Sequence, residues 1–223
     1  GYSQRQDLAD LMAAARGAQQ LARRRAAEAS LEEILADPDL RAFAIAGGKT
    51  AFGDNCAACH GPGGGGRPGY PILADDDWLW GGSIQDIHQT VMHGIRHEGA
   101  ETRISEMPAF GADGTLTRPQ IVDVAEHVLS LTGRATDAAA AERGASPYAE
   151  NCAACHGDRG QGERAMGAPA LDNDIWLYGG DRAAIIAQIT RPRHGVMPAW
   201  SGRLDAVTLK MLAVYVHALG GGE

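Results

Sequence analysis

Two identical heptapeptides carry all four cysteines of the chain and are the residues best suited to chemistry. They are Asn55-Cys56-Ala57-Ala58-Cys59-His60-Gly61 and Asn151-Cys152-Ala153-Ala154-Cys155-His156-Gly157. In a Cys-x-x-Cys-His segment, the two thiols can reach both vinyl groups of one porphyrin and form thioether bonds. The adjacent histidine then binds iron as the proximal ligand. The pair of motifs therefore predicts two covalently bound haem c (heme c) groups.

Other uses of these cysteines fit the sequence less well. A zinc site built from two Cys pairs usually spaces them by roughly 15–20 residues, whereas 96 residues separate Cys56 from Cys152. A thioredoxin-like dithiol needs a strand before the motif, and here a helical pattern precedes it. A structural disulfide explains neither the histidine nor the repetition. Haem attachment is the interpretation that accounts for every residue of the motif.

Two methionines are the candidates for the distal ligand of each iron. Met107 and Met197 each begin a Met-Pro-Ala-aromatic unit, 47 and 41 residues after the proximal histidines. A thioether ligand raises the reduction potential and saturates the iron, which favours electron transfer over binding of small molecules. The order along the chain predicts the axial pairs His60/Met107 and His156/Met197. Three histidines near the methionine segments are the alternatives to these methionines: His93, His97 and His194.

Further residues are candidates for the surroundings of each haem. A histidine bound to haem iron usually donates its other ring N–H to a carbonyl oxygen, which fixes the orientation of the ring. Pro71 and Pro169, each in a Gly-x-Pro-x-Leu block, can supply that carbonyl. Four aromatic residues are candidates for the haem edge and its propionates, with ordinary core packing as the alternative: Trp78, Trp80, Trp176 and Tyr178.

An internal duplication must position these residues. Besides the heptapeptides, five blocks recur in the same order: Gly48-x-x-x-Phe52 with Gly144-x-x-x-Tyr148, Gly69–Leu73 with Gly167–Leu171, Trp78–Gly82 with Trp176–Gly180, Met107–Phe110 with Met197–Trp200, and Val124–Val128 with Leu212–Val216. Such a repeat means two copies of one domain. The predicted boundaries are a helical arm over 1–36, a first domain over 37–133 and a second over 134–223.

The predicted elements are helices joined by glycine-rich loops. Asp37 as N-cap and Pro38 at the first helical position begin a helix over 38–53. Short helices are expected over 83–94 and 181–191, and closing helices after Thr117 and Asp205. The closing helix of the first half is expected on its own opening helix, with His127 near Gly48 and Phe52. Residues 132–142 are the expected linker, and Ser30 begins a capping box in the arm.

Composition and charge limit the partners. A net charge of −8 argues against nucleic acid. Residues 37–133 carry thirteen acidic and six basic residues, whereas 134–223 carry ten and nine. This imbalance suits either attraction of a cationic partner or an ordinary solvated surface. No run of about 18 apolar residues occurs that would span a membrane.

With these residues in view, the chain resembles the di-haem cytochrome c subunit (CcoP or FixP type, subunit III) of cbb3-type cytochrome c oxidases. The resemblance covers nearly the whole chain, the arm included. The blocks that carry it are Gly1–Arg5, Leu31–Asp37, Asp75–Gly82, Met107–Gly111, Ile175–Gly179 and Leu212–His217.

The resemblance implies an all-α fold of two tandem class I cytochrome c domains behind an N-terminal helical arm. It implies a relay that takes electrons from donor cytochromes c to a mono-haem partner subunit and then to the catalytic subunit. It also implies the periplasmic side of the bacterial inner membrane and an anchor helix ahead of Gly1. Two alternatives stay open: a free-standing di-haem carrier, and a di-haem peroxidase with one open iron.

Overall fold

The computed structural model describes residues 3–222, so Gly1 and Tyr2 of the predicted arm and Glu223 lie outside the described residues. Over the described range the chain is all-α, and its only β features are isolated bridges. The helices are α1 (Gln4–Glu28), α2 (Leu31–Ala36), α3 (Pro38–Asn55), α4 (Ala57–His60), α5 (Ile84–His93), α6 (Arg118–Ser130), α7 (Ala138–Asn151), α8 (Ala153–His156), α9 (Arg182–Thr190) and α10 (Ala206–His217), with 3-10 turns η1 (Pro62–Gly64) and η2 (Arg164–Met166).

Local signals placed most helix ends correctly. The side chain of Asp37 accepts hydrogen bonds from the N–H groups of Asp39 and Leu40 and caps α3. The predicted capping box at Ser30 is present, closed by Glu33. The predicted linker over 132–142 is too long, because α7 already begins at Ala138 behind the N-cap Asp137. Alanine has the highest helix propensity, so the four alanines at 138–141 start the helix instead of joining the domains.

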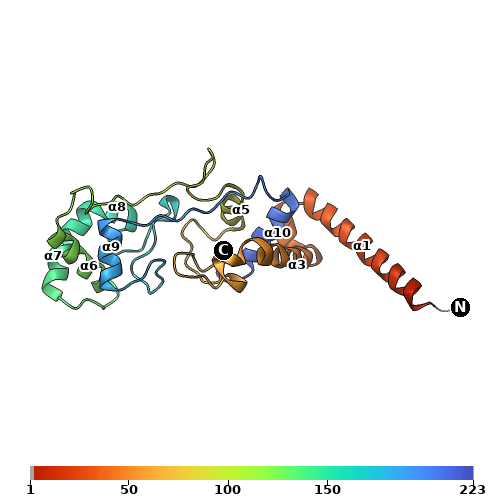
Figure 1. Ribbon diagram of the computed structural model, residues 1–223, viewed down its shortest axis with the longest axis horizontal. Helices are drawn as coiled ribbons and strands as arrows, with labels where there is room; N and C mark the ends of the chain where they lie inside the picture. The colour runs from red at the N-terminus through yellow and green to blue at the C-terminus, as the bar shows by residue number, and fades with distance from the viewer. Residues whose placement is uncertain (1–2, 223) are drawn as a thin grey trace.

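The helices form two lobes, and the chain passes between them twice (Figure 1). The first lobe contains α3, α4, α5 and α10, and α10 packs on α3 and α5. The second lobe contains α6, α7, α8 and α9, and α6 packs on α7 and α9. The closing helices are therefore exchanged relative to the repeat. Each opening helix is covered by the closing helix of the other copy.

Close contacts of two equivalent glycines show the exchange directly. A Cβ on Gly48 of α3 would lie 2.1 Å from the carbonyl oxygen of Met211 on α10. A Cβ on Gly144 of α7 would lie 2.1 Å from the carbonyl oxygen of Asp123 on α6. At both crossings only glycine lets the two backbones approach so closely.

The aromatic partners of the closing helices follow the same exchange. The ring of His127 on α6 lies 4.9 Å from the ring of Tyr148 on α7. The expectation that His127 lies near Phe52 is wrong, because Tyr215 of α10 occupies that place at 5.3 Å.

A short turn and one buried carboxylate explain why α6 stays with α7. Only residues 131–137 join the two helices, and a connection this short favours antiparallel packing of the neighbours. Glu126 of α6 is fully buried and accepts hydrogen bonds from the N–H groups of Thr136 and Asp137 in the turn. It also accepts a hydrogen bond from Arg182 Nε of α9 at 2.6 Å. The equivalent position in the other copy is Val214, whose apolar side chain cannot make these hydrogen bonds in the first lobe.

We expect Glu126→Gln to destabilise the second lobe by about 2–4 kcal/mol at neutral pH, because a buried amide N–H would face donors. Burial would by itself raise the pKa of Glu126, but the hydrogen bonds from Thr136, Asp137 and Arg182 lower it on balance. A lowered folded-state pKa gives stability above the unfolded value of about 4.3, which is lost as pH falls through the folded value. The difference between wild type and variant should therefore shrink below about pH 4.

Denaturant unfolding across pH measures this difference. Glu142→Gln, an exposed carboxylate of α7, is the matched control and should change little at any pH. Equal unfolding midpoints for wild type and Glu126→Gln at pH 7 would contradict the role of Glu126.

The lobes contact each other through a reciprocal pair of aromatic residues. Trp80 lies against Gly167, where a Cβ would be 2.2 Å from the ring, and Tyr178 lies beside Gly69. The Gly69 N–H also donates to the carbonyl oxygen of Leu177 at 2.8 Å. Trp80 and Tyr178 are equivalent in the repeat, as are the two glycines. The interface therefore has an approximate twofold relation.

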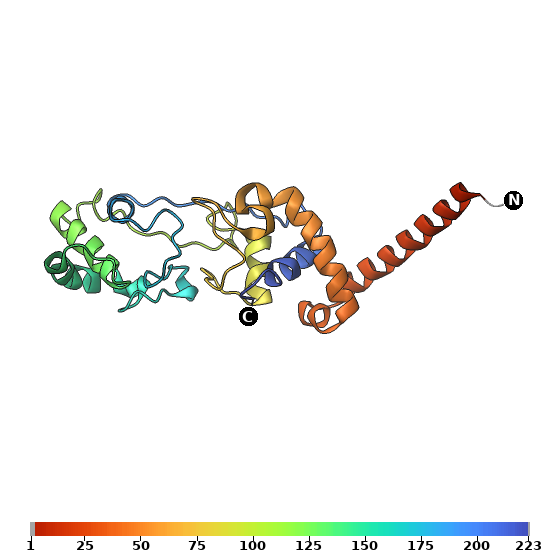
Figure 2. The same ribbon diagram turned by 90° about the horizontal axis from the view of Figure 1, so that it is seen from below.

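The arm α1 leaves the first lobe as a long single helix that points away from the second lobe (Figure 2). Within the described part of the arm, the attachments to the lobe lie near the C-terminal end of α1, where Lys210 Nζ donates to the carbonyls of Ala27 and Ala29 at 3.0 and 2.6 Å. Arg23 pairs with Asp205 at 2.8 Å, and Arg25 pairs with Asp37. These two arginines therefore help to attach the end of the arm to the first lobe. No helix in residues 3–222 has the length and apolar character needed to cross a membrane.

Candidate functional site: two Cys-x-x-Cys-His centres

Each cysteine motif occupies the same local structure in its lobe. Short helices α4 and α8 follow α3 and α7 directly, and Cys56 and Cys152 are the residues at the two junctions. Each motif ends at a glycine with φ near +76 to +79°, Gly61 and Gly157. This left-handed turn sends the chain back under the histidine. The two motifs therefore present their cysteines and their histidine in the same local backbone geometry.

The histidines of the two motifs make the carbonyl contacts that the sequence predicts. His60 Nδ1 lies 3.1 Å from the carbonyl oxygen of Pro71, and His156 Nδ1 lies 2.9 Å from that of Pro169. In this contact Nδ1 carries the proton and donates it to the carbonyl oxygen, which leaves Nε2 unprotonated and able to bind a metal. Burial lowers the pKa of both imidazoles, although the carbonyl contact opposes the shift. Burial is the larger of the two effects, so the net shift of the pKa favours the neutral ring.

One thiol of each pair is more deeply placed: Cys56 is partly buried and Cys59 exposed, whereas Cys152 is buried and Cys155 partly buried. Burial, and to a lesser extent the neighbouring cysteine, raises the pKa of Cys56 and of Cys152 to about 11. The two thiols are therefore protonated at neutral pH.

The methionines lie in the lobes opposite to those expected. Met197 packs on the core of the first lobe together with Cys56, and Met107 packs on the core of the second lobe together with Cys152. The Met197 backbone exchanges two hydrogen bonds of 3.0 Å with Ile95 of the first lobe. This packing is opposite to the pairing expected from order along the chain, in which Met107 goes with His60 and Met197 with His156. The physical reason is that each methionine lies shortly before a closing helix and packs in the same lobe as that helix.

The four predicted aromatic residues divide into two kinds. Trp78 Nε1 donates to the carbonyl of Gly221 at 2.6 Å, and Trp176 Nε1 donates to that of Asn173 at 3.1 Å. Their N–H groups are thus already used, and these rings offer only their faces. Trp80 and Tyr178 lie at the contact between the lobes.

Unpaired donors fit an anionic ligand at each centre. Among residues 3–222, three buried side-chain nitrogens have no hydrogen-bond acceptor: Trp80 Nε1, Arg103 Nε and Arg134 Nη2. The Arg103 guanidinium stacks on Trp80 at 5.3 Å, and that of Arg134 stacks on Trp176 at 5.5 Å. Leaving buried donors unpaired costs about 1–3 kcal/mol each. The carboxylates of haem propionates are acceptors of the right kind, so these residues fit the cofactor that the cysteines indicate.

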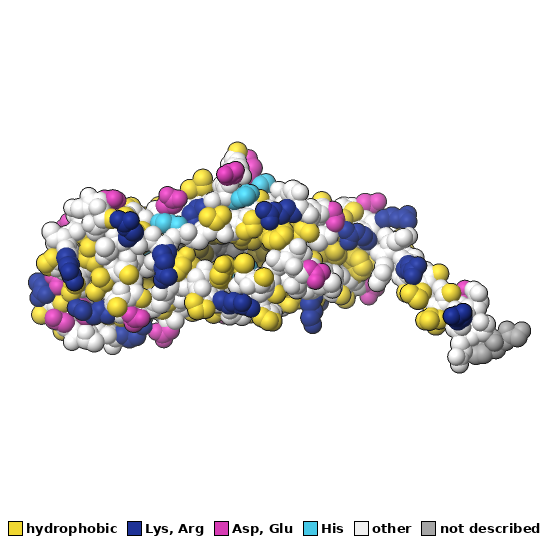
Figure 3. Space-filling model, in the orientation of Figure 1, with side chains coloured by type: hydrophobic (Ala, Val, Ile, Leu, Met, Phe, Trp, Pro, Cys, Tyr) yellow, Lys and Arg dark blue, Asp and Glu magenta, His cyan; other side chains and the backbone are white. Residues whose placement is uncertain are grey.

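Hydrophobic side chains also surround a hollow near the middle of the molecule (Figure 3). Such a hollow suits a large apolar ring system with polar groups at its edge.

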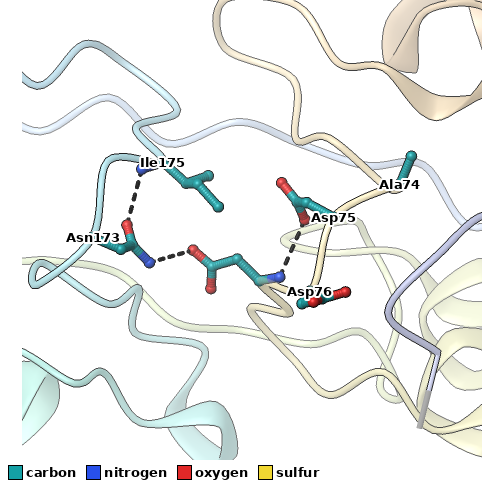
Figure 4. A pocket seen from close by; sticks show the side chains of 6 residues that line it. Ala74, Asp75, Asp76, Asn173 and Ile175 are labelled. Carbon is teal, nitrogen blue, oxygen red and sulfur yellow. Dashed lines mark hydrogen bonds between the residues drawn. The ribbon is translucent and has the colours of Figure 1, made fainter.

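An acidic cleft lies where the two lobes meet (Figure 4). Its volume is about 530 Å³, and Asp75, Asp76 and Asp77 line it from the first lobe, with Asn173 and Ile175 from the second. Asp77 accepts a hydrogen bond from Asn173 Nδ2 at 2.9 Å. Burial raises the pKa of Asp75. Part of this acidic run therefore joins the lobes, which supports a structural role for it.

Sequence reasoning missed four residues around the sites. Arg103 and Arg193 each stand four residues before a methionine, and Arg193 stacks on Tyr178 at 4.6 Å. That shared spacing was the signal that would have found them. Arg134 and Glu126 have no counterpart in the repeat, so no pattern indicated them.

The two histidine centres, with cysteine pairs and buried donors in an all-α fold, define the class of protein as a c-type cytochrome. Residues 43–128 and 139–216 match the family described as cytochrome c oxidase, cbb3-type, subunit III. Three relatives that align over the full length of this chain are cbb3-type cytochrome c oxidase subunits. CcoP of Azospirillum brasilense is 54% identical, FixP of Bradyrhizobium sp. (strain ORS 278) 53%, and CcoP of Cereibacter sphaeroides 50%; the aligned part covers 77–78% of each relative.

The chain belongs to the cbb3-type cytochrome c oxidase subunit III family. Its function is electron transfer with covalently bound haem c in a membrane-associated respiratory oxidase. The relatives named above are all oxidase subunits, so the free-standing carrier and the peroxidase are not favoured.

Proposed function

We propose that this chain holds two haems c and relays electrons between them on the way to the oxygen-reducing subunit. One observation carries the proposal: both lobes present a Cys-x-x-Cys-His helix whose histidine is fixed by a proline carbonyl, at 3.1 and 2.9 Å. An enzyme that binds oxygen or peroxide needs a free iron position. Here a methionine packs on the core of each lobe, where it can fill that position.

The residues of the chain divide the work of each site. Cys56 and Cys59 would anchor one haem, and Cys152 and Cys155 the other. His60 and Met197 would bind the first iron, and His156 and Met107 would bind the second. The haem supplies a one-electron ferric–ferrous couple when bound. Because neutral imidazole and thioether keep their protonation state in both oxidation states, transfer at these ligands needs no proton movement.

The unpaired donors have a role of their own in this proposal. Arg103 and Trp80 in the first lobe, and Arg134 stacked on Trp176 in the second, offer unpaired N–H groups for propionates: Arg103 Nε, Trp80 Nε1 and Arg134 Nη2. A guanidinium beside a propionate neutralises its charge, which prevents that charge from stabilising the ferric state.

The partners follow from the family. A donor cytochrome c supplies electrons on the periplasmic side of the inner membrane. A mono-haem cytochrome c subunit accepts them and passes them to the catalytic subunit. An anchor helix ahead of Gly1 would hold the arm α1 at the membrane surface, with the two lobes at its far end.

We expect two haems per chain, both retained by the protein in acid–acetone, because thioether bonds survive that extraction. The double variant Cys56→Ala/Cys59→Ala should keep one haem, and so should Cys152→Ala/Cys155→Ala. Haem content per chain and carbon monoxide binding by the reduced protein are the two measurements. Wild type should bind no carbon monoxide rapidly, since methionine saturates both irons. A haem that moves into the organic phase, or a native haem that binds carbon monoxide at once, would contradict the proposal.

A further inference from the structure

Two segments of the chain cross between the lobes: one leaves the first lobe after α5, and the other returns to it before α10. Arg96 lies where these two crossing segments meet. It follows α5 in the loop that begins at Gly94, and its φ of +51° makes it the only non-glycine residue of 3–222 in the left-handed region. Gly94 itself is tightly enclosed, since a Cβ there would lie 2.3 Å from the Met197 carbonyl oxygen. A long side chain in such a conformation requires support from its surroundings.

The backbone at Arg96 is bonded to both crossing segments. The Arg96 N–H donates to the carbonyl of Arg103 at 2.8 Å, on the segment that leaves the first lobe. Its neighbour Ile95 exchanges hydrogen bonds with Met197, on the segment that returns. Residues 94–96 therefore lie between the outgoing and the returning chain.

The Arg96 side chain repeats this double connection. Its Nε donates to the carbonyl of Gly195 at 2.6 Å, and its Nη1 donates to the carbonyl of Ser105 at 2.9 Å. Ser105 and Gly195 stand at equivalent places in the repeat, each two residues before a methionine. One guanidinium thus binds both methionine segments, each at the residue two places before its methionine.

Beside the two carbonyls that Arg96 binds, side-chain packing gives the segments little support. Ile104 and Val196, the residues beside the two carbonyl-bearing positions, are 67% and 63% exposed. Arginine is suited to the task, because its rigid planar fork can serve two acceptors at once, which the single ammonium of lysine does less well.

We propose that Arg96 is a positioning residue that holds both distal methionine segments together, so that methionine ligation at the two irons is coupled. This inference rests on the proposed methionine ligation. Without the guanidinium, both segments gain freedom, and both thioethers leave their irons more easily.

Displacement of methionine by added imidazole tests the proposal on the ferric protein with both haems. The loss of the far-red band of the iron–thioether bond reports the rate at each site. In Arg96→Asn, which tolerates a left-handed φ, we expect displacement about tenfold faster at both irons, the size of one lost hydrogen bond from a charged donor. Arg96→Lys should lie between this variant and wild type. Arg191→Asn, an exposed arginine on the returning segment, should match wild type.

The outcomes separate the two proposals. Unchanged rates at both irons in Arg96→Asn, or a change at one iron only, would overturn the coupling while leaving methionine ligation intact. Absence of the thioether band in the unmodified protein would overturn the ligation itself and the coupling with it. Haem content of each variant confirms folding, and if Arg96→Asn does not assemble, a wild-type rate in Arg96→Lys overturns the proposal.

Discussion

In a variant without Cys152 and Cys155, which keeps only the haem of the first motif, replacing Met197 by alanine should turn the remaining iron high-spin. Replacing Met107 by alanine in the same background should leave it low-spin. The reason is the exchange of the closing helices: Met197 returns to the first lobe and Met107 leaves it. A domain model based on the repeat predicts the opposite result for both substitutions.

The measurements are the absorption spectrum and the reduction potential of the remaining haem. Met197→His in this background should lower the potential by about 0.2 V, within the ~0.8 V span that axial ligands cover. Met107→His is the matched control, with the same chemical change in the other lobe. A potential that responds to Met107 and not to Met197 would show that the crossed assignment is wrong.

An independent measurement needs no substitution. In the reduced protein with both haems, magnetisation transfer in proton NMR should connect the Met197 methyl group with the haem bound to Cys56 and Cys59. The Met107 methyl group should connect with the haem bound to Cys152 and Cys155. This NMR measurement can be made even where the single-haem variants fold poorly.

A fragment over 104–194 should assemble one haem with a low-spin spectrum, whereas a fragment over 134–223 should not be as stable. The whole core of the second lobe, from Met107 to Ile189, lies within the first fragment. The second fragment follows the repeat but lacks α6. It therefore leaves Arg182 without Glu126 and exposes the face of α7 at Gly144 and Tyr148.

We expect the unfolding free energies of the two fragments to differ by at least about 3 kcal/mol, from the lost core of α6 and the broken Glu126–Arg182 pair. Denaturant unfolding followed by haem absorption measures the difference. Both fragments carry the same Cys-x-x-Cys-His motif, α7, α8 and α9, so haem attachment itself is controlled. Equal stability, or a low-spin spectrum for 134–223 alone, would contradict the lobe assignment.

The sequence by itself determined the chemistry and the local structure. The Cys-x-x-Cys-His motifs, the proline carbonyls at Pro71 and Pro169, and the caps at Ser30 and Asp37 depend on residues close in the chain. Their geometry follows from short-range hydrogen bonds that the residue types dictate. The duplication likewise required only the comparison of one half with the other.

Only the tertiary structure decided which half completes which site. The two copies present similar opening helices, with Gly48 and Gly144 at the crossing point, so a closing helix can pack on either one. The short turn over 131–137 and the buried Glu126 keep α6 on α7, and α10 must then cover α3. No local pattern encodes that choice, because Glu126, Arg134 and Arg96 act through partners far away in the sequence or absent from the repeat. The two candidate methionines were therefore visible in the sequence, whereas the cysteine motif beside which each one packs was not.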